Sequence, residues 1–222
     1  MTTTERVLRK DALRNRQRIL AAARELFADR GLGVTLNEIA HHADVGVGTV
    51  YRHFPDKALL IEELFDAELG EIVGLLESAR SDPDPWHALV EFLERVLELQ
   101  ARDRALKDIL LGAPGTPERI ATVRATLHPL AAEVVERARA AGAVSPDCEP
   151  QDFGVVQLMV GAVIDAGRQV APELWRRYLA IALQGLRPQG APLDVLRTAA
   201  VSPEEMDPLL VAAQRARQSQ QA

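Results

Sequence analysis

The segment from Asp44 to Lys57, DVGVGTVYRHFPDK, concentrates side chains that can bind a polyanion. Its donor-bearing side chains can all form hydrogen bonds with phosphate oxygens: Thr49, Tyr51, Arg52, His53 and Lys57. Gly46 and Gly48 stand at its start, although each glycine costs a helix about 1 kcal/mol relative to alanine. That cost is explained if the backbone has to lie very close to another molecule.

Two short helices are predicted on either side of a tight turn in this region. Thr35-Leu-Asn-Glu38 has the capping-box pattern, in which Thr35 caps the amide of Glu38 and the Glu38 side chain reaches back. This pattern predicts a helix over 35–42, and a second helix is predicted over 46–54. Two such helices form a helix-turn-helix, whose second helix lies in the major groove of DNA.

Apolar residues at helical spacing, separated by proline- and glycine-rich breaks, predict helices along the rest of the chain. The predicted ranges are 11–29, 56–80, 86–101, 103–112, 117–141, 150–169 and 172–186, with one more amphipathic helix near 203–217. The fold class is therefore all-α, with an N-terminal three-helix DNA-binding domain containing the helix-turn-helix and a C-terminal helical bundle. The predicted domains are 1–60 with a flexible basic arm at 1–10, 61–187 for the bundle, and 188–222 for a tail that is partly helical or disordered.

Charge is unevenly distributed between these parts. Residues 1–60 carry ten Lys/Arg and seven Asp/Glu, a net of +3, whereas 61–222 carry sixteen and twenty-five, a net of −9. A basic segment on an acidic body indicates a local contact with a polyanion, and a solvated, charged helix start is the alternative. The arm would either be disordered or enter the minor groove, as such arms do in other helix-turn-helix proteins.

Composition indicates a helical protein with an aliphatic core, since aromatic residues make up 4% of the chain and charged residues 26%. The single cysteine, Cys148, excludes an intramolecular disulfide, fits a reducing cytoplasm and is expected to be an inert surface residue. The N-terminus lacks a signal-peptide core, and polar residues interrupt the most apolar window, 153–170. We therefore expect a cytoplasmic protein without a membrane span, associated with the nucleoid when it is bound to DNA.

The stretch TLNEIAHHADVGVGTVYRHFPDKALLIEEL, with ILAAARELF at 19–27 before it, resembles the DNA-binding signature of the TetR family of one-component bacterial regulators. The similarity is dense from Arg16 to Leu64, and beyond it only the all-helical layout agrees. The resemblance implies that Val50 and Phe54 are core residues. It implies DNA contacts for Thr35, Asn37, Val47, Gly48, Thr49, Tyr51, Arg52, His53 and Lys57.

The implied roles differ along this set. Thr35 would also cap its helix, Asn37 would reach a base edge, and Tyr51, His53 and Lys57 would bind phosphates. Val47 and Gly48, at the reading tip with Thr49, depart from the polar residues that some members have there. Specificity would then rest more on Asn37, Thr49, Arg52 and DNA shape, with a solvated charge as the alternative for Arg52.

The resemblance also implies a homodimer, because two recognition helices must reach half-sites about 34–36 Å apart. The 150–169 helix is apolar around most of its circumference and needs a second cover, for which we expect a second subunit, with the 172–186 helix completing a four-helix interface. Burial inside a monomer is the alternative. The predicted interface residues are Phe153, Val156, Val160, Ile164, Trp175, Tyr178, Leu179 and Ala182.

A small-molecule effector is expected inside the bundle of helices from about 61 to 169, where it would favour a form that no longer fits the operator. The candidate lining residues are Trp86, Phe92, Val96, Met159 and Val163, and their helical spacing favours ordinary core as the alternative for each. The expected partners are thus a palindromic DNA operator, an effector and a second copy of the chain, and repression is the expected outcome.

Catalytic and cofactor motifs are missing from the sequence: there is no nucleophile elbow, P-loop, Rossmann glycine pattern or zinc signature. His41 and His42 are adjacent and point to different faces of their helix, so they do not form a metal-binding pair. We therefore predict no enzyme, cofactor or metal. The other class left open is a ligand-binding or architectural helical protein without effector-controlled operator binding.

Overall fold

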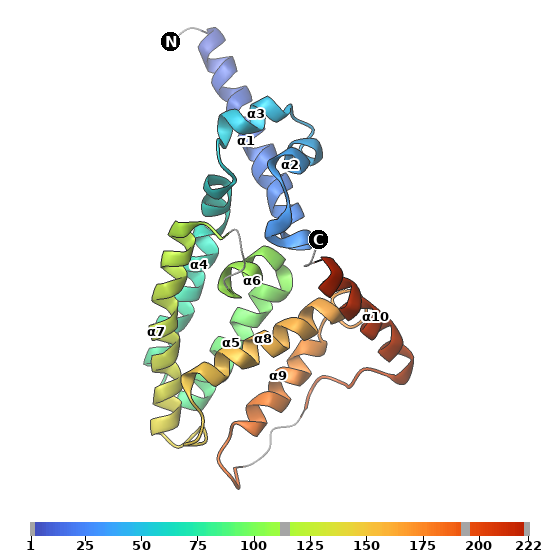
Figure 1. Ribbon diagram of the computed structural model, residues 1–222. Coiled ribbons are helices and arrows are strands. Elements are labelled where there is room, and N and C mark those ends of the chain that lie inside the picture. The colour runs from blue at the N-terminus through green and yellow to red at the C-terminus, as the bar shows by residue number, and fades with distance from the viewer. Residues whose placement is uncertain (1–2, 112–115, 192–195, 220–222) are drawn as a thin grey trace. The chain divides into compact units, whose positions relative to one another are not determined.

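The chain folds into helices, and the all-α fold class is confirmed. The computed structural model describes residues 3–111, 116–191 and 196–219, and these residues contain no strand. The helices (Figure 1) are α1 (Thr3–Arg30), the short 3-10 helix η1 (Gly31–Gly33), α2 (Leu36–His42), α3 (Val47–His53), α4 (Lys57–Ser81), α5 (Pro85–Arg102), α6 (Arg104–Leu111), α7 (Glu118–Ala140), α8 (Pro150–Gly167), α9 (Leu174–Gly185) and α10 (Pro203–Ser219).

The largest difference from the predicted helices lies at the N-terminus. α1 begins at Thr3 rather than near Asp11, so the helix includes most of the segment that we expected to form a flexible arm at 1–10. The helix predicted near 203–217 is present as α10, and residues 220–222 of the tail lie outside the described part of the chain.

The helices form two compact units. The first contains Met1–Gly70 and Arg102–Arg124, and the second contains Glu71–Ala101 and Ala125–Ala222. α4 and α7 each contribute residues to both units. The functional domain boundaries predicted at residues 60 and 187 stay predictions.

An apolar core holds the first three helices of the first unit together. Ile19, Ala23 and Phe27 of α1 are spaced by four residues, so they share one face, and all three are 0% exposed. Val50 of α3 is also fully buried, and the ring of Phe27 lies 6.4 Å from that of Phe65 in α4. The short helices α2 and α3 are therefore fixed by packing on α1 rather than by their own length.

The turn after α1 is fastened to α6 within the same unit. Gly31 ends α1 with a φ of 69°, in the left-handed region that favours glycine. Oδ2 of Asp108 in α6 accepts a hydrogen bond from the N–H of Leu32 at 3.0 Å. α6 also packs against α1, so one short helix contacts both the long helix and the turn that leads into α2.

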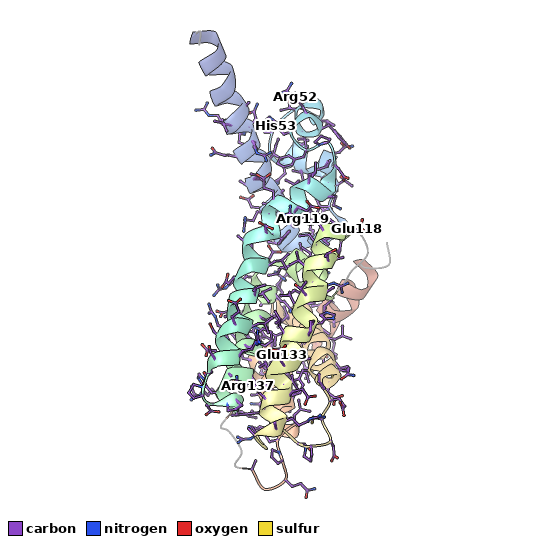
Figure 2. The ribbon with its side chains drawn as sticks, turned by 90° about the vertical axis from the view of Figure 1, so that its left-hand side faces the viewer. Arg52, His53, Glu118, Arg119, Glu133 and Arg137 are labelled. Atoms are coloured by element: carbon purple, nitrogen blue, oxygen red, sulfur yellow. The ribbon has the colours of Figure 1, made fainter. Side chains whose placement is uncertain are left out.

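The second unit is built around α5, α8 and α9 with the adjoining parts of α4 and α7. α9 packs along α8, and Arg176 of α9 pairs with Glu98 of α5 at 3.6 Å. Arg137, near the lower end of α7 in Figure 2, donates hydrogen bonds to the carbonyl oxygens of Ala79 and Asp82 at 2.6 and 2.5 Å. α10 packs against α8. Among the described residues, no helix combines the length and apolar character needed to cross a bilayer.

The expectation that Cys148 lies on the surface is wrong. Its side chain is 8% exposed, because the loop after α7 folds back onto the end of α9, where Ser145 N–H donates to the carbonyl oxygen of Leu186 at 2.8 Å. Burial raises the pKa of the Cys148 thiol, and its Sγ lies 3.8 Å from the same carbonyl oxygen. A thiol held in this way is a poor nucleophile.

Candidate DNA-binding surface and helical bundle

The start of α2 forms the predicted capping box. The hydroxyl of Thr35 accepts a hydrogen bond from Glu38 N–H at 3.3 Å, and Oε2 of Glu38 accepts one from Thr35 N–H at 2.8 Å. The hydrogen bond from the Thr35 backbone, with others from the Thr35 hydroxyl and Arg30, lowers the pKa of Glu38 to about 2. Thr35 remains exposed, so its side chain caps the helix at a position that solvent can reach.

The turn between α2 and α3 depends on a contact that the sequence reasoning missed. Asp44 adopts a φ of 50°, which is unusual for a residue other than glycine. Arg18 of α1 donates hydrogen bonds to the carbonyl oxygen and to Oδ2 of Asp44 at 2.9 and 3.1 Å. These two hydrogen bonds join α1 to the turn between α2 and α3. An aspartate after a helix end was a visible signal for the left-handed conformation, but its partner was not visible.

One face of α3 is buried and the opposite face is open. Val50 is 0% exposed and Phe54, just after the helix, is 1% exposed, which confirms them as core residues. Val47 is 45% exposed and Tyr51 is 46% exposed, one helical turn apart. Gly48 and Arg52 are also exposed, Thr49 is half-buried, and Asn37 is exposed on α2.

His53 and Lys57 are less available than the other predicted contacts. His53 is half-buried and its Nε2 has no hydrogen-bond partner in the protein. Burial, followed by the charges of Arg52 and Arg16, lowers the pKa of His53, so the ring is neutral near pH 7. The ammonium of Lys57 donates a hydrogen bond to the carbonyl oxygen of Leu32, and burial lowers its pKa. Lys57 therefore also supports the turn after α1.

Two family models match the chain, one over the helix-turn-helix and one over the helices that follow it. The model for bacterial regulatory proteins of the tetR family matches residues 19–64, and that for the C-terminal domain of SbtR-like transcriptional regulators matches residues 84–188. The chain belongs to the TetR family. It is a transcriptional regulator with an N-terminal helix-turn-helix DNA-binding domain, and the family members that it matches are regulators rather than enzymes.

Individual relatives agree with the TetR-family assignment. The HTH-type transcriptional regulator SAB2452 of Staphylococcus aureus (strain bovine RF122 / ET3-1) is 37% identical over 92 residues, which are 41% of this chain and 48% of that protein. The chain spans about half the length of the curated relatives that it matches.

Two solved structures of similar proteins share the fold. The TetR transcriptional regulator SCO0520 from Streptomyces coelicolor has a TM-score of 0.53 at 26% identity, with 79% of this chain and 99% of that one covered. NalD from Pseudomonas aeruginosa, the secondary repressor of the MexAB-OprM multidrug efflux pump, has a TM-score of 0.53 at 26% identity, with 80% and 99% covered.

In this TetR-family chain, most of the residues predicted at a dimer interface are already buried within one copy. Six of them are at most 4% exposed: Phe153, Val156, Val160, Ile164, Trp175 and Leu179. Tyr178 is 39% exposed and Ala182 is half-buried. A second subunit could therefore contact only the last two without a rearrangement of the bundle.

A different set of apolar residues faces outward from the same two helices. We call it the outer face of α8 and α9, and it consists of Val155, Leu158, Met159, Tyr178 and Ile181, which are 39–57% exposed. Their spacing of three or four residues along each helix places them on one side. Apolar side chains that gather in this way mark an interaction surface.

The residues predicted to line an effector site do not lie together on one buried face. Phe92 and Val96 are 7% and 3% exposed on the inner side of α5. The ring of Trp86 is half-buried and lies 4.6 Å from the guanidinium carbon of Arg187. Val163 is half-buried, whereas Met159 is 53% exposed on the outer face of α8 and α9. Its exposure favours a role at that surface over one inside the bundle.

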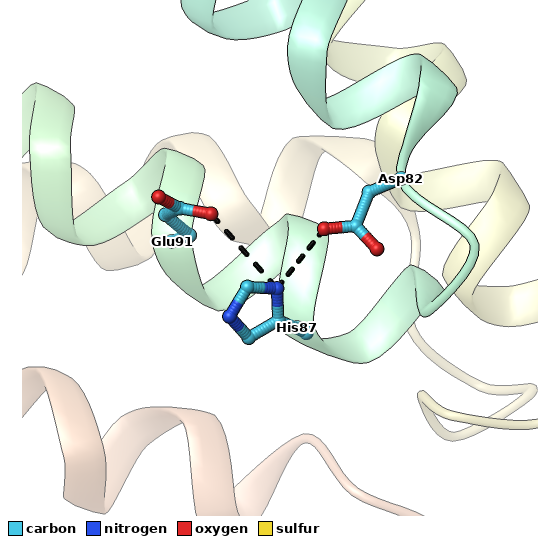
Figure 3. A group of neighbouring side chains, drawn as sticks. All are labelled: Asp82, His87 and Glu91. Carbon is cyan, nitrogen blue, oxygen red and sulfur yellow. Dashed lines mark hydrogen bonds and ion pairs between the residues drawn. The ribbon is translucent and has the colours of Figure 1, made fainter.

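An exposed cluster joins the α4–α5 turn to α5. Nδ1 of His87 lies 3.0 Å from Oδ2 of Asp82 and 3.9 Å from Oε2 of Glu91, as Figure 3 shows. The hydrogen bond to Asp82 raises the pKa of His87, and the pKa of Asp82 is lowered, first by a hydrogen bond from the Asp84 N–H and then by His87. Because Nδ1 of His87 is already hydrogen-bonded, we read the cluster as a surface ion pair that strengthens below neutral pH.

Proposed function

We propose that this TetR-family regulator is a repressor whose homodimer binds a palindromic operator and leaves it when a small molecule binds the second unit. The observation that carries the proposal is the two-sided character of α3. Val50 and the adjoining Phe54 anchor it in the core, while Val47, Gly48 and Tyr51 stand exposed on the other side. A helix fixed in this way can enter the major groove without unfolding its own domain.

The predicted DNA contacts differ in how exposed their side chains are and in whether those side chains already form hydrogen bonds within the protein. Tyr51 and Arg52 are exposed and can reach phosphates or base edges directly, as can Asn37 from α2. The Thr35 hydroxyl already donates its one proton to Oε2 of Glu38, so it would have to turn away from that carboxylate to donate to a phosphate. His53 would act as a neutral hydrogen-bonding group, and Lys57 would act mainly by supporting the turn after α1.

The homodimer proposal now rests on the outer face of α8 and α9 rather than on the residues predicted from the sequence. A partner covering that face would bury Leu158 and Met159, which are 57% and 53% exposed. Complete burial of an apolar side chain of this size contributes about 1.5–3 kcal/mol, and because only about half of each side chain remains to be buried, each would contribute about 1–1.5 kcal/mol. Two helices from each copy would then form a four-helix interface.

Release by an effector would require a mechanical link to the helix-turn-helix, and α6 supplies one within the first unit. Asp108 of α6 binds the N–H of Leu32, and Leu32 also accepts a hydrogen bond from Lys57 through its carbonyl oxygen. A displacement of α6 would therefore act on the turn between α1 and α2. An effector would exert it by binding more tightly to a form of the protein in which α6 is displaced.

The test begins with selection of bound duplexes from fragmented genomic DNA. The Tyr51→Ala protein is then compared with Tyr51→Phe and the natural protein by fluorescence anisotropy. A hydrogen bond to a charged group contributes about 1.5–3 kcal/mol, so removal of the hydroxyl alone should weaken binding about tenfold or more per half-site. Both variants should unfold at the natural temperature, because Tyr51 is 46% exposed.

Salt gives a second readout of the same interface. Affinity should fall steeply as the salt concentration rises, because cationic side chains that neutralise phosphates release counterions. The slope should be shallower for Arg52→Ala, which removes a cation, and unchanged for Tyr51→Ala, whose hydroxyl is neutral. Natural affinity in both tyrosine variants would contradict the α3 assignment. Failure to select any specific duplex would favour the architectural or ligand-binding alternative.

A further inference from the structure

A polar side chain is the last residue of the buried face of α5, near the end of the helix. Gln100 is 0% exposed, and neither its Nε2 nor its Oε1 has a hydrogen-bond partner in the protein. It follows Val96 by four residues and Phe92 by eight, so the three side chains share one side of the helix. Lys107, the other buried polar residue among those described, does take part in an interaction.

An unpaired amide at this position works against folding. A buried donor or acceptor that loses its partner lowers the folding equilibrium constant by a factor of about 5 to 150. The great majority of buried side-chain polar atoms have a hydrogen-bond partner, so each exception needs an explanation. An aliphatic residue at position 100 would continue the stripe formed by Leu89, Leu93 and Val96 without this penalty. The fold alone therefore does not explain the glutamine.

We propose that Gln100 is the polar anchor of the effector site in the second unit, an inference that rests on the proposed function. The carboxamide presents one donor and one acceptor side by side. Its complement is a neutral group with an adjacent acceptor and donor, namely an amide, a lactam or a protonated carboxylic acid. The body of the molecule is apolar, because Val96 and Phe92 precede the amide by one and two helical turns on the same face.

An ionised carboxylate does not meet this requirement. It could accept a hydrogen bond from Nε2 of Gln100 but would leave Oε1 unpaired and facing a negative charge. A charge buried beside Phe92 and Val96 would also lack a counterion on that face of α5. The site therefore selects neutral amide-like ligands over anions of the same size.

The test uses three compounds that share one apolar body: 4-butylbenzamide, 4-butylacetophenone and butylbenzene. Their dissociation constants are measured by calorimetry on the natural protein, on Gln100→Met and on Gln169→Met, which changes an exposed glutamine after α8 in the same way. The natural protein and Gln169→Met should bind the benzamide at least about tenfold more tightly than the other two compounds. Gln100→Met should lose this preference. An equal preference in Gln100→Met, or no binding of the benzamide to the natural protein, would overturn the proposal.

Measurements without any added compound separate the remaining explanations. Gln100→Met should unfold at the natural temperature or above it, since it replaces an unpaired amide with an apolar side chain of similar length. A clear fall would mean that an internal water already satisfies Gln100, and the proposal would be wrong. Gln100→Met should also bind operator DNA as tightly as the natural protein. If the natural protein binds no specific duplex while the benzamide preference holds, the repressor proposal fails and the anchor stands.

Discussion

Replacement of Gly31 by alanine should destabilise the first unit through two separate effects. Gly31 has a φ of 69°, which L-residues with a Cβ rarely adopt. A Cβ at this position would also collide with Oδ2 of Asp108, the atom that accepts the hydrogen bond from Leu32 N–H at 3.0 Å. The aspartate side chain can rotate away, so the second effect is loss of that hydrogen bond rather than an immovable clash.

The size of the effect follows from these two parts. The left-handed conformation costs an L-residue about 1–2 kcal/mol. Loss of a part-buried hydrogen bond, with the Leu32 amide left unpaired, costs about 1–2 kcal/mol more. Gly31→Ala should therefore lower the free energy of unfolding by about 2–4 kcal/mol.

Two other glycines of the chain serve as matched controls. A Cβ on Gly142 meets nothing within 4 Å, but its φ is 68°, so Gly142→Ala should show the backbone effect alone, about 1–2 kcal/mol. A Cβ on Gly33 also meets nothing within 4 Å, and its φ lies outside the left-handed region, so Gly33→Ala should change stability little.

Urea unfolding followed by circular dichroism measures all three variants, and tryptophan fluorescence separates the units. Both tryptophans, Trp86 and Trp175, belong to the second unit, so Gly31→Ala should shift the dichroism transition more than the fluorescence transition. If Gly31→Ala is no more costly than Gly142→Ala, the Asp108 hydrogen bond contributes nothing. If Gly33→Ala is equally costly, the whole explanation is refuted.

Three further predictions concern charge and assembly. Hydrogen bonds from Thr35 lower the pKa of Glu38 from 4.5 to about 2, so the contribution of Glu38 to stability is present above pH 4.5 and is lost as the pH falls through about 2. In acid unfolding, the free energy of unfolding of Glu38→Gln should therefore depend less on pH in this range than that of the natural protein. Asp82 raises the pKa of His87 above 6.5, so the contribution of His87 to stability is full below pH 6.5 and is lost as the pH rises through the higher pKa of the folded state. The unfolding temperature of His87→Gln should therefore depend less on pH in this range than that of the natural protein. Leu158→Glu should turn dimers into folded monomers in analytical ultracentrifugation, and an intact dimer would exclude the outer face of α8 and α9.

Local signals in the sequence were sufficient to place most of the helices, but not the start of α1. The capping box begins α2 at Leu36, directly after the predicted cap, and proline or glycine breaks bound α5, α8 and α9 within two residues of their predicted starts. Such signals act over a few residues and do not depend on how the chain folds elsewhere. The buried side of α3 was also predictable, because Val50 and Phe54 are spaced by one helical turn.

The sides of α8 could not be assigned from its sequence. Apolar residues surround most of this helix, so periodicity cannot tell which side its own chain covers. The interface was predicted around Phe153 and Val156, whereas the structure buries those residues and exposes Val155 and Leu158. The contacts of Asp108 and Arg18 were out of reach for a related reason: their partners are 76 and 26 residues away in the chain, and no local pattern specifies such a pair.

The reading tip of α3 presents the clearest case of a residue that the fold does not require. Gly48 is exposed and a Cβ there would meet nothing within 4 Å, so alanine would fit and would favour the helix by about 1 kcal/mol. Val47 beside it exposes 45% of an apolar side chain to water. Neither residue improves the isolated domain. Both make sense if a DNA backbone must approach α3 at Gly48 while the Val47 methyl groups meet a thymine methyl. Hydrogen-bonded readout would then rest on Asn37 and Arg52, two exposed side chains able to donate to a base edge.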